Sequence, residues 1–172
     1  MDGMQRVFLA LWPSTPVVER LRTVVPLHVS GRHMRPDTFH MTLAFIGAAD
    51  EDCLERIATA ADSVQVPPFT LRLDHLGYWA GNHILWAGPS RSPRELLELA
   101  GGLRDALDAQ AVSYEPHRFT PHVTLVRNAS AVVPARLSEP IDWDVAGWCL
   151  VSSRPDAHGP HYELLARWHC RP

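Results

Sequence analysis

Two copies of a short histidine-containing motif are the part of this sequence best suited to do chemistry. His-Met-Thr-Leu begins at His40, and His-Val-Thr-Leu begins at His122. Successive side chains of a β-strand point to opposite faces, so the His and the Thr of each copy share one face. We therefore expect each motif to present an imidazole and a hydroxyl on one side of a strand and to bury its apolar residues on the other.

A pair of imidazoles with hydroxyl donors is suited to acid–base chemistry on a phosphate. The ordinary pKa of His lies near neutrality, so one member of a pair can be neutral while the other is protonated. The neutral ring can take a proton from water, and the protonated ring can give one to the departing oxygen. The hydroxyls of Thr42 and Thr124 can donate to the non-bridging oxygens as negative charge develops there. Such a site needs no cofactor.

No metal site is expected either. His158 and His161 have a spacing that matches no zinc motif carried by a helix or a strand, and they are predicted to lie in an exposed loop. Cys53, Cys149 and Cys170 fit no zinc or redox spacing, so we expect reduced thiols and a cytoplasmic protein.

Composition narrows the possible partners and reactions. The chain has 172 residues and a net charge of −3 with His neutral, which argues against binding to long nucleic-acid duplexes. All 16 basic residues are Arg, so a lysine nucleophile or Schiff base is excluded. No apolar run approaches the roughly 18 residues of a membrane span, and no signal-peptide pattern opens the sequence. We expect no membrane partner.

Apolar periodicity and turn residues predict an α+β fold. The predicted strands are 7–12, 39–46, 69–76, 83–87, 119–126, 145–152 and 161–168, and the predicted helices start at Thr15, near residue 50 and at Ser92. Thr15 is expected to cap the first helix, Gly47 to end the second strand, and Ser92 to open a capping box. Because each half carries one motif strand, we expect residues 1–172 to form a single domain of two intertwined, pseudo-symmetric lobes, with helices outside and a central cleft.

Several segments together resemble the 2H phosphoesterase superfamily, and within it the bacterial RNA 2′,3′-cyclic phosphodiesterases, also called 2′-5′ RNA ligases. The resemblance rests on residues 6–11, 39–47 and 119–127 and on Ser152-Ser153 followed by Tyr162, and it spans nearly the whole chain. It implies a bilobal fold of two antiparallel-rich sheets around a cleft. It also implies metal-independent hydrolysis of a 2′,3′-cyclic phosphate to a 2′-phosphomonoester.

The resemblance also implies roles for single residues. His40 and His122 would be catalytic, with Thr42 and Thr124 on the phosphate. Family analogy makes His40 the acid toward the 3′ oxygen and His122 the base for water, although the two motifs are symmetric in sequence and leave this order open. Arg127 matches a family Arg near the phosphate. Strand alternation places it opposite Thr124 unless the strand bulges or ends there.

Two aromatic residues are candidates for stacking a nucleobase, namely Phe8 and Tyr162. The Trp residues are expected to be structural. The chain departs from the family pattern before the first motif, where Arg32, His33 and Arg35 make the approach more basic. Thr120, before the second motif, is a further departure. These changes can alter which nucleotides or strands are accepted.

The expected partners are RNA ends or small cyclic nucleotides, bound by a monomer. Two alternative functions stay open: 2′-5′ RNA ligation, which is the reverse reaction, and non-catalytic binding of cyclic-phosphate or oligoadenylate ends. A metal-dependent hydrolase is a more distant alternative. The sequence does not identify the natural substrate among tRNA halves, other RNA ends and small cyclic nucleotides.

Overall fold

The computed structural model describes residues 3–172. Within this range the strands are β1 (Gln5–Leu11), β2 (Arg32–His33), β3 (Met41–Ala49), β4 (Phe69–Trp79), β5 (Ile84–Gly88), β6 (Val123–Arg127), β7 (Ala135–Val145), β8 (Gly147–Asp156) and β9 (Gly159–His169). The helices are α1 (Thr15–Thr23), α2 (Glu51–Asp62) and α3 (Arg94–Ala109), with a short 3₁₀ helix, η1, at Pro36–Thr38.

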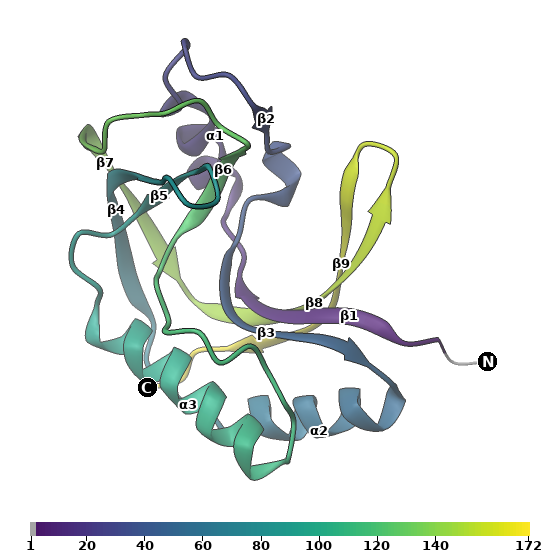
Figure 1. Ribbon diagram of the computed structural model, residues 1–172. Helices are drawn as coiled ribbons and strands as arrows, with labels where there is room; N and C mark the ends of the chain where they lie inside the picture. Colours follow the sequence, from purple (N-terminus) through teal and green to yellow (C-terminus); the bar gives the residue numbers. More distant parts are fainter. Residues whose placement is uncertain (1–2) are drawn as a thin grey trace.

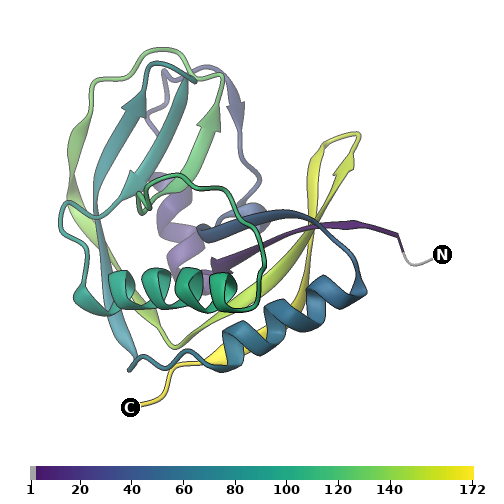
Figure 2. The same cartoon turned by 60° about the horizontal axis from the view of Figure 1, so that its bottom comes forward.

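The strands form two antiparallel sheets, as Figure 1 shows. Sheet A has the order β3-β1-β8-β9, and sheet B has the order β2-β6-β5-β4-β7. Only Ala146 separates β7, at the edge of sheet B, from β8 in sheet A, so the chain passes directly from one sheet to the other. The predicted α+β class with antiparallel sheets is confirmed. Helices α2 and α3 lie side by side along the outside of the sheets, and α1 packs against β7 (Figure 2).

Strand β1 is apolar on both faces, which sets its role in the fold. Val7, Leu9 and Leu11 are fully buried in a core that both sheets share with the helices. The alternating residues Phe8 and Ala10 are buried on the opposite face, in a separate smaller cluster. One face of sheet A therefore closes the core, and the other is left to form the floor of a site.

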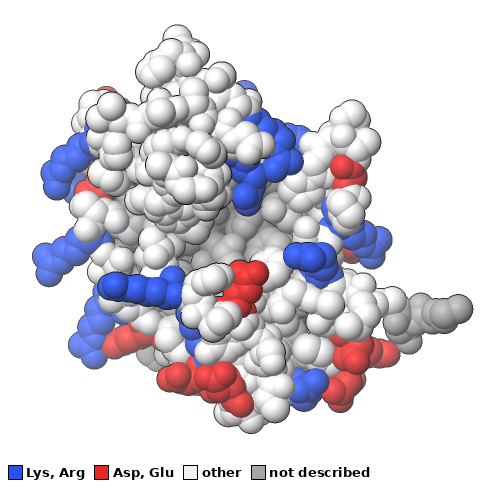
Figure 3. Space-filling view, viewed as in Figure 1, with Lys and Arg blue, Asp and Glu red and all other residues white. Residues whose placement is uncertain are grey.

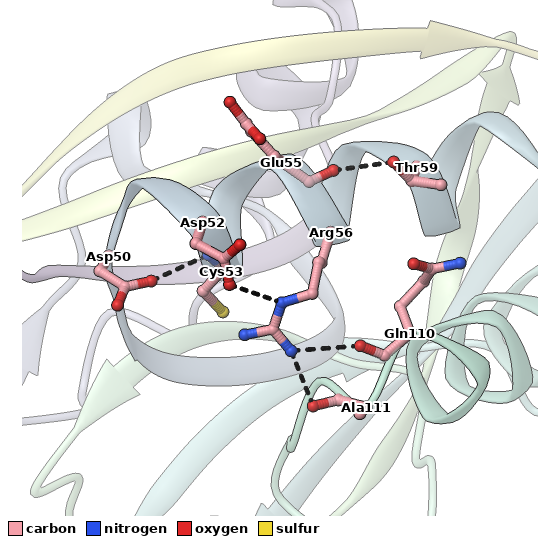
Figure 4. A network of polar contacts seen from close by, with 8 residues as sticks. All are labelled: Asp50, Asp52, Cys53, Glu55, Arg56, Thr59, Gln110 and Ala111. Atoms are coloured by element: carbon pink, nitrogen blue, oxygen red, sulfur yellow. Dashed lines mark hydrogen bonds and ion pairs between the residues drawn. The ribbon is translucent and has the colours of Figure 1, made fainter.

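Helix α2 is fixed at its start and tied to the end of α3 (Figure 4). The Asp50 side chain accepts a hydrogen bond from the Cys53 backbone N–H at 2.8 Å, as an N-cap should. Arg56 donates to the backbone oxygens of Gln110 and Ala111 at 3.2 and 3.0 Å. A cation near the carbonyls at a helix C-terminus is favourable, so this contact holds the two outer helices together.

Three local predictions are wrong. The N-cap of α1 is Ser14 rather than Thr15, and α3 begins after Pro93 with no side-chain cap, so the capping box at Ser92 does not form. Strand β3 continues past Gly47 to Ala49. Gly47 has a φ of +89°, and the pairing of β3 with β1 skips one residue just before it. The glycine thus marks a β-bulge inside the strand, not its end.

Two strands were missed in the sequence. β2 is only two residues long and both are exposed, which is too short for any periodic signal. β7 contains Pro140, and no strand is predicted there from the sequence. It lies at the edge of sheet B, where a strand can tolerate the missing N–H of proline. No helix in the described part of the chain is long and apolar enough to cross a membrane.

Candidate active site

The two histidine motifs lie where the sheets approach each other. His40 directly precedes β3, the edge strand of sheet A, and His122 directly precedes β6 in sheet B. β3 and β6 contact each other (Figure 1). The predicted strands 39–46 and 119–126 therefore begin too early, because both histidines stand at the entry to a strand and not inside it. One motif from each half of the chain is brought to the junction of the sheets.

The ring of His40 is held by its own segment. Its Nδ1 lies 2.8 Å from the backbone oxygen of Thr38, and its Nε2 lies 3.1 Å from the Oγ1 of Thr42. A carbonyl oxygen only accepts, so Nδ1 must be the donor and the neutral ring keeps its lone pair on Nε2. The Thr42 hydroxyl can then donate to Nε2. This contact confirms that His40 and Thr42 share one face.

The ring of His122 is anchored in the same way. Its Nδ1 lies 2.7 Å from the backbone oxygen of Thr120, again two residues earlier in the chain. Nδ1 donates here too, so Nε2 is the nitrogen left for proton transfer in both rings. Thr124 follows two residues later in β6 and is partly exposed. The two motifs therefore share their local geometry as well as their sequence.

Aromatic rings surround His40. Trp12 stacks on it with centroids 5.6 Å apart and planes at 9°, Phe8 lies 4.8 Å away, and Tyr162 meets it edge-on at 5.2 Å. Phe8 is only 3% exposed, which leaves little of its ring for a nucleobase. Tyr162, from β9, is partly exposed. Phe8 and Trp12 thus support the imidazole, and Tyr162 is the better placed of the two predicted stacking residues.

His122 has its own aromatic support in sheet B. Trp79 meets it at 4.6 Å and Trp86 at 6.4 Å, both at steep angles. A Cβ added at Gly77 or at Gly88 would collide with the Trp86 ring, so these two glycines make room for it. Trp12, Trp79 and Trp86 are predicted from the sequence to be structural, and the structure places all three against the histidines. The sequence did contain one signal for this packing: the neighbouring strands β4 and β5 each carry a glycine, and a glycine in a strand can mark the close approach of a large group.

Arg127 reaches the site because β6 is irregular. Leu85 pairs with Val126 while Trp86 pairs with Thr124, so Leu125 is an extra residue that forms a bulge. A bulge of one residue reverses the alternation beyond it, which places Arg127 on the same face as Thr124. Strand alternation alone predicts Arg127 on the face opposite Thr124, and this bulge is the irregularity that reverses the prediction.

Both histidines are neutral in the free protein at neutral pH. Burial lowers the pKa of His40 to about 4, an effect that Arg127 and a protonated His122 reinforce and the hydrogen bond to Thr38 opposes. Burial also lowers the pKa of His122, with a further contribution from Arg127. A bound anion would offset the cationic contribution and raise both pKa values.

Arginine side chains act on the pKa values of the site residues. Burial raises the pKa of Tyr162, against the opposing effect of Arg127, Arg32 and Arg35. The charged groups that influence His40, His122 and Tyr162 are all cationic. Figure 3 shows a hollow in this face of the molecule, with arginine side chains on its rim and acidic side chains at its lower edge. A chain with a net charge of −3 thus concentrates positive charge where its histidines meet, as an anion site requires.

The cysteine closest to this floor is not a nucleophile. Cys149 is buried in the small cluster with Phe8, and its thiol donates to the backbone oxygen of Ala10 at 3.4 Å. Burial raises the pKa of Cys149 to about 12, which keeps the thiol protonated. Cys53 and Cys170 are also unpaired. His158 and His161 lie on the β8–β9 hairpin, and no cluster of three or more potential metal ligands is found among residues 3–172.

Comparison with known proteins identifies the family. The sequence model of the 2′-5′ RNA ligase superfamily matches residues 9–157, which include both histidine motifs. The chain belongs to the 2′-5′ RNA ligase superfamily. The RNA 2′,3′-cyclic phosphodiesterase of Escherichia coli K12 is 32% identical over 136 residues, covering 77% of each chain. That of Thermus thermophilus is 30% identical over 179 residues, covering 96% of this chain and 88% of the relative.

Solved structures of other proteins share the fold. E. coli LigT in its apo form superposes with a TM-score of 0.86 at 28% identity over 99% of each chain. A crystal structure titled as a phosphoesterase gives 0.89 at 29% identity over 98% of this chain and 99% of the other. E. coli LigT has also been crystallised with 3′-AMP, phosphate, NADP+ and ATP. The family resemblance predicted from the motifs is confirmed.

Proposed function

We propose that this protein is an RNA 2′,3′-cyclic phosphodiesterase that hydrolyses cyclic phosphate ends to 2′-phosphomonoesters with His40 and His122 as its catalytic residues. The observation that carries the proposal is the repeated anchor: each ring donates Nδ1–H to the carbonyl two residues earlier, so Nε2 is the nitrogen of each ring left for proton transfer. The names of the relatives from E. coli and T. thermophilus support the same reaction.

Hydrolysis of the cyclic phosphate requires one group that accepts a proton from water and one that donates a proton to the 3′ oxygen. A neutral Nε2 accepts a proton from water as the water oxygen bonds to phosphorus. A protonated Nε2 on the other ring gives its proton to the 3′ oxygen as the phosphorus–oxygen bond breaks, which leaves a 3′ hydroxyl and a 2′-phosphate. Thr42, Thr124 and the Arg127 guanidinium are proposed to donate to the non-bridging oxygens as charge develops. No metal takes part in these steps.

We keep the order that family analogy implies, with His40 as the proton donor to the 3′ oxygen and His122 as the acceptor from water. Burial lowers the pKa of both rings, so the direction of the shift is the same in each. The Thr42 hydroxyl lies 3.1 Å from the Nε2 of His40, at the nitrogen that would carry the transferred proton.

The proposed substrates are RNA ends or small cyclic nucleotides, bound by a monomer that forms one two-lobed domain. Tyr162 is the proposed platform for a base, since it is the partly exposed ring at the site. The nucleotide and phosphate complexes of E. coli LigT support a nucleotide in this cleft. Ligation of 2′-5′ ends would use the same residues in reverse, as the superfamily name implies.

The direct test is product identity. Adenosine 2′,3′-cyclic phosphate is incubated with the protein in excess EDTA, and the monophosphate is identified by chromatography against 2′-AMP and 3′-AMP. We expect 2′-AMP only. Formation of 3′-AMP would break the assignment, and tight binding without any product would favour the non-catalytic alternative.

A further inference from the structure

An arginine pair at the rim of the site has no counter-charge. β2 pairs with β6 in a register that sets Arg32 directly opposite Arg127. Like charges directly opposite on neighbouring strands destabilise a sheet, because their Cβ atoms are only about 5 Å apart. Within the described residues neither arginine forms an ion pair, whereas the nearby Arg35 contacts Asp37 at 3.4 Å. The repulsion between these two guanidiniums in the free protein would be offset by an anionic ligand bound to both.

Arg32, the other member of this pair, lies close to the β8–β9 hairpin. Arg35 donates to the backbone oxygen of Pro160 at 2.8 Å, which ties the segment before β3 to the hairpin that carries Tyr162. The Arg32 guanidinium reaches the same hairpin, and its Nη1 lies 3.7 Å from the position of a Cβ on Gly159. Arg127 is therefore the cation that acts on the two histidines, and Arg32 lies beside it toward the β8–β9 hairpin.

We propose that Arg32 binds the phosphate on the 5′ side of the nucleotide whose cyclic phosphate reacts. This rests on the proposed function and deepens it: a cyclic-phosphate nucleotide that carries a 5′-phosphate is preferred over one with a free 5′ hydroxyl. A terminal nucleotide in RNA has phosphates on both sides of its ribose, and two neighbouring guanidiniums match two neighbouring phosphates. Arg suits this task because its planar fork can donate two hydrogen bonds to one phosphate.

The experiment compares two substrates that differ by one phosphate. Adenosine 2′,3′-cyclic phosphate is assayed with a 5′ hydroxyl and with a 5′-phosphate, and the ratio of their kcat/KM values is measured. We expect the 5′-phosphorylated substrate to be favoured about tenfold, mostly through KM, since one charge-assisted contact contributes on that scale. In Arg32→Gln the ratio should fall close to one, and Arg32→Lys should retain part of it.

A matched control distinguishes the proposed contact between Arg32 and the 5′-phosphate from the effect of removing one positive charge elsewhere on the protein. Arg94 is 87% exposed and begins α3, which lies away from β2 in both views of the fold (Figures 1 and 2). Arg94→Gln removes the same charge and should leave the substrate ratio as in the unsubstituted protein. A ratio near one in the unsubstituted protein, or a ratio that Arg32→Gln leaves unchanged, would overturn the proposal.

A binding measurement keeps the two proposals distinguishable. Calorimetry with 2′-AMP and with adenosine 2′,5′-bisphosphate compares the same two phosphates without turnover. Absence of hydrolysis for both cyclic substrates would refute the proposed function. Tighter binding of the bisphosphate that Arg32→Gln abolishes would still support the second phosphate site, and equal affinities would refute it.

Discussion

Trp12 stacks on His40 with nearly parallel rings, 5.6 Å between centroids and 9° between planes. Trp79 supports His122 in turn, at 4.6 Å. Each imidazole is therefore fixed twice, by a backbone carbonyl at Nδ1 and by an indole against its ring. Catalysis by proton transfer depends on such fixed geometry, because a shift of the order of 1 Å at the reacting atoms can cost about a hundredfold in rate.

Trp12→Ala is expected to lower kcat at least about tenfold, because His40 loses its stacking partner. The same change exposes the ring to water and should move the pKa of His40 upward, toward its ordinary value. The pH profile of kcat/KM reports this shift, which a purely global loss of stability would not produce. Trp12→Phe should restore most of the rate. An unchanged rate and pH profile in Trp12→Ala would show that the indole does not position His40.

Gly77→Ala tests the support beneath His122. The added methyl would collide with the Trp86 ring, so we expect a loss of stability of about 1–3 kcal/mol and reduced turnover. Gly81 offers a matched control, since nothing lies within 4 Å of a Cβ at that position. Chemical unfolding and kcat are measured for both variants. Equal stability and activity in the two would contradict the proposed packing of Trp86.

Protonation of His40 should destabilise the fold in acid. Its pKa is about 4 in the folded protein and 6.5 as the reference value, so the unfolded chain takes up the proton first. The contribution of neutral His40 to the free energy of unfolding is complete above about pH 6.5 and is lost as the pH falls toward 4. Its full size is about 3 kcal/mol. The measurement is the free energy of unfolding at about pH 7.5 and about pH 4.5. His40→Asn should lose less stability between these two values than the unsubstituted protein, and an identical loss would contradict the lowered pKa.

The same pKa shifts set the pH dependence of activity. The profile of kcat/KM reports the ionisation of groups in the free protein, where burial holds both imidazoles below their ordinary pKa. We expect a bell-shaped profile with its maximum below about pH 6.5. The profile of kcat should lie at higher pH, since the bound phosphate favours the protonated rings. A maximum of kcat/KM well above neutrality would argue against two histidines with lowered pKa values.

The sequence was informative where a short pattern has one physical interpretation. The His-x-Thr spacing placed His40 and Thr42 on one face by strand alternation alone, and the contact between them bears this out. Apolar periodicity was enough for the three helices and most strands. These features depend on local geometry, which a single segment contains.

What could not be predicted depends on pairing between distant segments. The bulge at Leu125 that turns Arg127 toward the site appears only when β6 is paired with β5. Arg32 faces Arg127 because a two-residue strand pairs with β6, and no periodicity reveals so short an element. The three tryptophans beside the histidines look like core residues in sequence, since their partners lie on other strands.

The most direct test of the central claim is the activity of His40→Asn and His122→Asn on adenosine 2′,3′-cyclic phosphate in EDTA. Both variants keep a polar group of similar size, so circular dichroism should show a retained fold. We predict that each variant loses at least about a hundredfold in kcat, the scale of one acid–base partner, while the unsubstituted protein forms 2′-AMP. Near-normal turnover in either variant would contradict it.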